Sequence, residues 1–153
     1  MIPTRFHAAV RRYATAGEAL SERLAEGVAA DPRCPVTRYL LGCQAFDQDC
    51  RATGTRHMMI AYHAEPDLQS AALLVFTGLV WGDEPDAPLL AVLERTYELF
   101  RRPPFDETPT ERLLLDAFPP GPALRAALPE ALCRFSRLPL ASLRGQLATA
   151  RTA

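Results

Sequence analysis

Hydrophobic residues recur every three or four positions along most of this chain. Phe6, Val10 and Tyr13 follow this spacing near the N-terminus, and a longer series continues it through residues 36–46. Side chains at this spacing lie on one face of an α-helix, whereas a half-buried strand needs strict alternation. The sequence contains neither an alternating run nor a β-hairpin turn. The pattern therefore predicts an all-α protein.

Capping residues and prolines predict where the first helices begin. Thr15 followed by Glu18 fits a capping box, which predicts a helix over residues 16–29. Pro35 fits the first turn of the next helix, where its missing N–H costs nothing. We therefore expect helices over residues 3–14, residues 16–29 and from Pro35 onward.

Residues 35–66 predict a hairpin of two antiparallel helices. Residues 51–54 interrupt the hydrophobic pattern, so we expect the first helix to end before them. Thr53 or Thr55 can cap the second helix, and Pro66 ends it. The two helices are expected to meet near Gly42, Ala45 and Ala61.

The second half of the chain continues the helical pattern. Asp67 is expected to cap a segment that is apolar on nearly all sides up to residue 81, which predicts the central buried helix. A further helix is predicted over residues 87–100. The run from Thr108 to Glu111 combines a cap, an early proline and a returning Glu, so it predicts a helix start. Pro129 should break or kink the helix that follows.

Composition points to a single globular domain, residues 1–153. The chain is 48% hydrophobic and 23% charged, which excludes a disordered protein. Its net charge of -1 gives no electrostatic reason to expect nucleic acid or a membrane as a partner. All 17 basic residues are Arg, and Lys and Asn are absent, which is typical of a GC-rich genome and favours a bacterial source.

Nothing in the sequence predicts export or a structural metal. The N-terminal residues carry charges where a signal peptide needs an apolar core, and the longest apolar run is about 11 residues, too short for a bilayer. We therefore expect a cytoplasmic protein. Its four cysteines show no C-x-x-C spacing, so neither a zinc ribbon nor a thioredoxin-like motif is predicted.

A period of 34 residues organises the first two thirds of the chain. Pro32 and Pro66 lie 34 residues apart, and Pro103 closes a third pair of helices after a longer interval. The central unit has small and large residues where the tetratricopeptide repeat places its packing residues: Leu41, Gly42, Ala45, Gly54, Met58, Ala61 and Pro66. The first unit matches at Ala8, Leu24, Gly27 and Pro32, and the third at Gly78, Ala91 and Pro103.

Over residues 1–103 the chain thus resembles a degenerate tetratricopeptide array. The resemblance implies stacked antiparallel helical hairpins, with residues 108–153 as a C-terminal helical cap. The central unit departs from the family where Arg38 and Ala45 replace its Trp and Tyr. A generic helical bundle is the alternative architecture.

The resemblance also implies a partner-binding groove lined by the first helix of each hairpin. Transferring that face to this chain gives six candidate binding residues: Arg5, Arg12, Tyr13, Tyr39, Phe46 and Asp47. Arg and aromatic side chains are enriched at interface hot spots. The groove has no Lys or Asn of the kind with which some relatives hold a terminal carboxylate, so we do not expect that ligand.

The sequence contains no catalytic motif. We therefore expect no catalytic site, no metal site and no cofactor. The leading interpretation is a non-enzymatic adaptor or chaperone-like subunit that binds a protein or peptide. One alternative is a small helical enzyme or metal-handling protein centred on His57, Met58, Met59 and His63, whose side chains suit soft metals. Another is a structural subunit of a larger homo- or hetero-oligomer.

Overall fold

Every regular element in the described part of the chain is helical. The structure is a computed structural model that describes residues 4–80 and 108–137, and no strand occurs in these two ranges. The all-α prediction is therefore confirmed there. The elements are α1 (Thr4–Ala14), the short 3-10 helix η1 (Gly17–Ala19), α2 (Leu20–Ala30), α3 (Pro35–Asp47), α4 (Arg51–Ala64), α5 (Gln69–Val80), α7 (Pro109–Ala117) and α8 (Pro122–Arg137).

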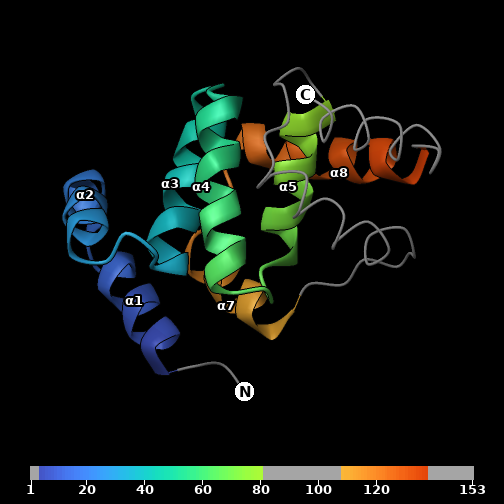
Figure 1. Cartoon of the computed structure of the whole chain (residues 1–153). Coiled ribbons are helices and arrows are strands. Elements are labelled where there is room, and N and C mark those ends of the chain that lie inside the picture. Colours follow the sequence, from blue (N-terminus) through green and yellow to red (C-terminus); the bar gives the residue numbers. More distant parts are fainter. Residues whose placement is uncertain (1–3, 81–107, 138–153) are drawn as a thin grey trace, which may run out of the picture.

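Three consecutive helices, α3, α4 and α5, run side by side and alternate in direction (Figure 1). The helix α1 packs against α3, and α2 lies at the outer side of the same helix. The pair α7 and α8 returns to this layer from far along the chain. The helix α8 crosses both α5 and α3, while α7 lies near the start of α5 and contacts α1.

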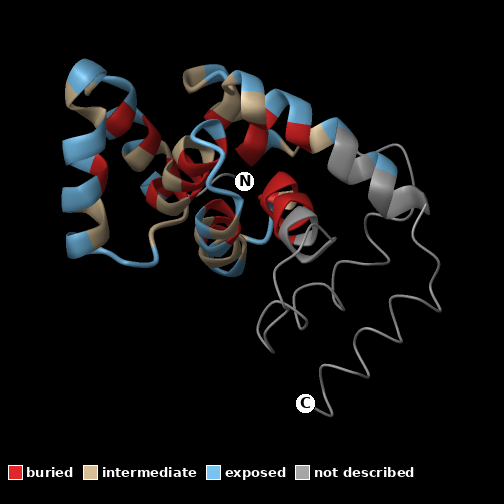
Figure 2. Ribbon diagram, turned by 90° about the horizontal axis from the view of Figure 1, so that it is seen from above, coloured by how far each residue is buried: buried red, intermediate tan, exposed pale blue. Residues whose placement is uncertain are grey.

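The hydrophobic core lies between these helices and draws on nearly all of them. Residues 71–75 of α5 are at most 2% exposed, which confirms for this part of α5 the prediction of a central buried helix. By contrast, α2 shows mostly exposed residues at one edge of the molecule (Figure 2). The core side chains from the other elements include Phe6, Leu24, Val36, Met58, Leu114 and Leu124.

Glycines allow α3 and α4 to approach closely. A Cβ atom at Gly42 would lie 2.7 Å from the methyl group of Met58, and one at Gly54 would lie 2.7 Å from the Phe46 ring. The expected meeting of the two helices near Gly42, Ala45 and Ala61 is consistent with this, because all three residues are buried. Pro66 follows the end of α4 at Ala64, as predicted.

The predicted interruption at residues 51–54 is wrong. The helix α4 already begins at Arg51, and the turn lies before it, where Asp49 adopts a φ of 59°. Gly54 is a buried residue inside α4 rather than a helix breaker. It is small because the Phe46 ring occupies the space that a side chain would need.

The capping box predicted at Thr15 and Glu18 is also absent. The Thr15 hydroxyl donates backwards to the carbonyl oxygens of Arg11 and Arg12, each at 3.2 Å. No side chain caps η1 or α2. Ser and Thr hydroxyls often form such local bonds to the preceding turn, which competes with capping of the next helix.

The predicted start at Thr108 is confirmed, because the Thr108 hydroxyl accepts from the N–H of Glu111 at 3.2 Å. The helix α8 runs through Pro129 without a break. The helix predicted over residues 87–100, the third repeat unit and the end of the chain lie outside the described residues. Within the described ranges we found no helix long and apolar enough to cross a membrane.

Candidate functional site

The six predicted binding residues divide into a buried aromatic set and an exposed charged set. Tyr13, Tyr39 and Phe46 are at most 2% exposed and belong to the core. Arg5, Arg12 and Asp47 are exposed. The structure therefore does not bring the six side chains together in an open groove.

Both tyrosine hydroxyls find partners inside the protein. Tyr13 shares a hydrogen bond of 2.6 Å with the Thr37 hydroxyl. The Tyr13 hydroxyl lies where a Cβ atom at Gly27 would be. Tyr39 shares a bond of 3.1 Å with the Ser70 hydroxyl at the start of α5. These bonds satisfy the polar ends of the rings, so the tyrosines tie neighbouring helices together.

The most unusual group in the described residues is the carboxyl group of Glu111, whose residue is 0% exposed. Its Oε1 accepts from the N–H of Gln69 at 3.1 Å, and its Oε2 accepts from the N–H of Ser70 at 3.0 Å. Glu111 lies in the first turn of α7, whereas Gln69 and Ser70 begin α5. The Glu111 side chain therefore caps a helix that begins 42 residues earlier in the chain.

A second bond fixes the same two helix starts to one another. The Thr108 hydroxyl donates to the carbonyl oxygen of Asp67 at 2.7 Å. We call the contact made by Thr108 and Glu111 with residues 67–70 the Glu111 clamp. The Tyr39 hydroxyl extends it into α3 through Ser70. The clamp thus connects α3, α5 and α7 around one buried carboxyl group.

Burial raises the pKa of the Glu111 carboxyl group above its ordinary value of 4.5, because charge is unfavourable away from water. Hydrogen bonds from Ser70, Gln69 and Thr108 act in the opposite direction. The positive end of the α5 dipole also favours the charged form. The site therefore binds a carboxylate at a high desolvation cost that several donors offset.

A second polar contact joins α3 and α4. The Arg38 Nε donates to the carbonyl oxygen of Pro32 at 2.7 Å, and its Nη1 donates to Nδ1 of His57 at 3.1 Å. Burial lowers the pKa of His57 below 6.5, and the charge of Arg38 lowers it further. Because a guanidinium group can only donate, Nδ1 of His57 is the acceptor in this contact, which in a neutral ring leaves the proton on Nε2.

The residues of the metal-handling alternative have different surroundings. Met58 is 0% exposed and fills the space beside Gly42, while His57 is held by Arg38. His63 is exposed, lies beside the Tyr62 ring, and lines an open hollow of about 410 Å³ with Arg33, Ile60 and Ala64. Among residues 4–80 and 108–137, we found no group of three or more His, Cys, Asp or Glu side chains able to hold a metal ion.

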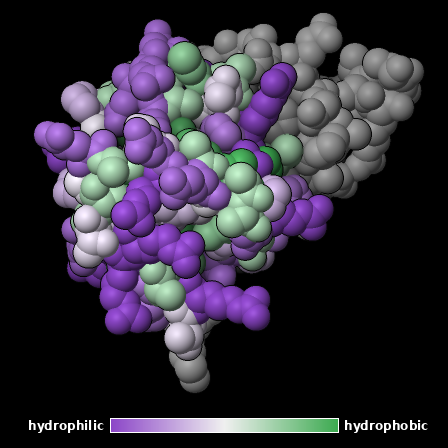
Figure 3. Space-filling model, turned by 90° about the vertical axis from the view of Figure 1, so that its left-hand side faces the viewer, coloured by the Kyte–Doolittle hydropathy of each residue, from purple (hydrophilic) through white to green (hydrophobic). Residues whose placement is uncertain are grey.

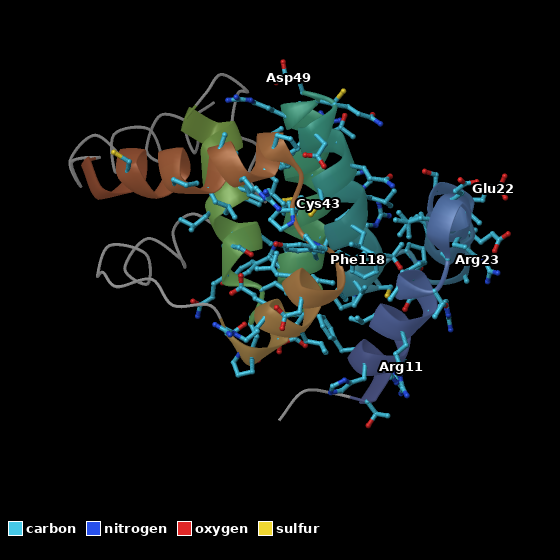
Figure 4. The ribbon with its side chains drawn as sticks, turned by 180° about the vertical axis from the view of Figure 1, so that it is seen from behind. Arg11, Glu22, Arg23, Cys43, Asp49 and Phe118 are labelled. Atoms are coloured by element: carbon cyan, nitrogen blue, oxygen red, sulfur yellow. The ribbon has the colours of Figure 1, made fainter. Side chains whose placement is uncertain are left out.

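Cys43 and Phe118 lie centrally, where α3 faces the α7–α8 pair, whereas Arg11, Glu22, Arg23 and Asp49 point outward from the periphery (Figure 4). Burial raises the pKa of the Cys43 thiol to about 12, and the Asp47 carboxylate adds to this effect. A thiol with so high a pKa stays protonated and unreactive at neutral pH. None of the four cysteines, which all lie in the described ranges, forms a disulfide.

Asp47 itself is brought against the start of α8. Its carboxylate lies where a Cβ atom at Gly121 would be, directly before Pro122 begins that helix. A carboxylate near a helix N-terminus is favourably placed for the helix dipole. Hence Asp47 contacts the returning α7–α8 pair, while Arg5 and Arg12 lie on α1.

Comparison with known proteins gives no relative: no family model, no curated protein and no solved structure matches the chain.

Glu111 has a role that the local sequence pattern does not predict. The pattern from Thr108 to Glu111 predicts only that Glu111 returns to the start of its own helix. In the structure the carboxyl group does turn back to Thr108, and it also accepts from the N–H groups of Gln69 and Ser70 in α5. No local signal predicts this second contact, because Glu111 and Gln69 lie 42 residues apart in the chain.

Proposed function

We propose that this protein is a non-enzymatic adaptor or chaperone-like subunit that binds a protein or peptide. The binding surface is the face of the α3–α5 layer that α8 crosses. We also propose that α1 to α5 form tetratricopeptide-like stacked hairpins, to which α7 and α8 add a cap. The observation that carries the proposal is the packing of α8 across both α3 and α5. A surface that holds one helix in this way is suited to others, since helix-in-groove recognition uses the same packing.

The charged residues at the edges of this layer support the proposal. Arg5 and Arg12 lie seven residues apart on α1, which is about two helical turns, and both are exposed. The outward face on the α2 side is mainly hydrophilic, with only scattered apolar side chains (Figure 3). Large exposed apolar patches commonly mark permanent interfaces, so this face fits solvent better than a fixed subunit contact.

Affinity purification with the tagged full-length chain from its source cells tests the proposal. Mass spectrometry identifies the recovered partner, and the double variant Arg5→Glu/Arg12→Glu should recover less of it, because rim charges steer binding. Arg11→Glu is the matched control, since Arg11 is an exposed Arg on the same helix and points from a different face. Equal recovery by the double variant and the control would contradict the binding edge on α1.

A further inference from the structure

We propose that the partner of this protein is an amphipathic helix with an acidic residue in its first turn, and that α7–α8 occupies the site of this helix in the structure described here. The inference rests on the proposed function and adds the chemistry of the partner. It also makes α7–α8 an internal competitor that the partner must displace.

Each helix of the α7–α8 pair buries only one face. Glu111 and Leu114 are buried on α7, and Leu124 and Ala127 are buried on α8. The opposite faces are open to solvent, with Arg112 and Asp116 exposed on α7 and Arg125, Ala126 and Pro129 exposed on α8. Both helices thus dock through a single face, as amphipathic ligands do.

The start of α5 binds a carboxyl group through two backbone N–H groups. The N–H groups of Gln69 and Ser70 have no partner within their own helix, because the first turn of any α-helix leaves its donors free. Here both donate to one carboxylate from another segment. An aliphatic side chain at this position would leave the buried N–H of Ser70 unsatisfied and the N–H of Gln69 with only the carbonyl oxygen of Asp67, at 3.0 Å. The site therefore selects an acidic residue followed three positions later by Leu, as Glu111 is followed by Leu114.

The start of α5 is also connected to Tyr39, one of the predicted binding residues. Tyr39 reaches Ser70 at 3.1 Å, and the α8 residue Leu124 shares one core cluster with Tyr39 and Phe46. Tyr39 and Phe46 thus belong to the same hydrophobic core as the buried face of α8. They are buried in this closed arrangement, and release of α7–α8 would expose part of the surface that contains them.

The test uses the full-length protein and a synthetic, fluorescently labelled peptide of residues 108–137. Glu111→Gln weakens the internal clamp, because the amide NH2 group faces a backbone N–H where the carboxylate accepted a bond. Loss of one such partner corresponds to about a five- to 150-fold change in the docking equilibrium. We expect fluorescence anisotropy to show tighter peptide binding to the variant by a factor in this range.

Three controls separate the outcomes. Asp116→Asn removes an exposed carboxylate from the same helix and should bind the peptide as the wild type does. A peptide that itself carries Glu111→Gln should bind the Glu111→Gln protein about five- to 150-fold more weakly than the unmodified peptide does. Hydrogen exchange should show that amides of α7 and α8 lose protection in the Glu111→Gln protein while those of α3 and α4 keep theirs.

Two results would overturn the inference. Unchanged protection of α7–α8 in the Glu111→Gln protein would show that the clamp does not hold this pair, and released helices without peptide binding would show that the face is not a docking site. If Glu111→Gln does not fold, Thr108→Ala removes only the hydroxyl bonds to Asp67 and Glu111 and takes its place. Unfolding of both variants would make α7–α8 an inseparable part of the core and would also overturn the inference. In either case, partner recovery that depends on Arg5 and Arg12 would leave the adaptor function standing.

Discussion

At the scale of single residues, Glu111 is the side chain whose environment most needs an explanation. A carboxyl group without solvent exposure pays a desolvation cost that an apolar residue would avoid. The two backbone N–H donors and the Ser70 hydroxyl offset this cost only in one geometry. The group therefore fixes where α7 lies on α5 more than it adds stability.

The raised pKa of Glu111 gives a pH dependence of stability with a defined sign. The folded protein holds the Glu111 proton more tightly than the unfolded chain, whose carboxyl group titrates near 4.5. The stabilisation that comes from this proton is complete below that value and is lost as the pH rises through the folded-state pKa. Urea unfolding of the wild type and Glu111→Gln across this window should show the difference between their free energies of unfolding shrinking as the pH rises.

Near neutral pH we expect Glu111→Gln to lower the free energy of unfolding by about 1–3 kcal/mol, because one backbone donor loses its acceptor. Asp116→Asn should change it by less than about 0.5 kcal/mol, since Asp116 is exposed. A difference between wild type and Glu111→Gln that grows with pH would contradict the assigned direction of the pKa shift.

At the scale of elements, the contact between α3 and α4 depends on Gly54. A side chain there would overlap the Phe46 ring, with its Cβ atom 2.7 Å from the nearest ring carbon. We expect Gly54→Ala to lower the free energy of unfolding by about 1–2 kcal/mol. Overpacking costs about 1–3 kcal/mol, and the better helix propensity of Ala returns up to about 1 kcal/mol of it.

Thermal or urea unfolding measures this effect. Thr53→Ala is the matched control, because Thr53 is the exposed neighbour of Gly54 in the same helix, and a change below about 0.5 kcal/mol is expected. A stabilised Gly54→Ala protein would show that the two helices do not approach as closely as the structure has them.

Helix existence was predictable from the sequence, because hydrophobic spacing and proline positions act locally. Pro35, Pro66 and Thr108 each mark a boundary that the structure confirms. The errors came where a distant residue decides. Gly54 signals a break locally but lies inside α4, where the Phe46 ring leaves no room for a side chain. Glu111 forms its predicted local contact with Thr108 but also caps α5, which the local pattern does not predict. The candidate site depends on such long-range contacts, so the sequence predicted its residue types but not their burial.

At the scale of the whole molecule, the proposed function depends on the return of α7–α8 onto α3 and α5. The Glu111 clamp holds this pair at the start of α5, and the contact between Asp47 and Gly121 holds it at the end of α3. The face of the helical layer is consequently covered at both ends. Our account requires that this cover and the partner helix compete for one surface.

A disulfide that locks the cover in place tests this competition most directly. Asp47→Cys and Gly121→Cys lie close enough to be bridged, because the side chain at position 47 already reaches the place of a Cβ atom at position 121. The pair is introduced together with Glu111→Gln, and Cys50→Ser and Cys133→Ser remove the exposed native thiols. The decisive measurement is the binding of the labelled peptide of residues 108–137 to the oxidised and the reduced form of this one protein. The account predicts binding to the reduced form only, and equal binding to both forms would contradict it.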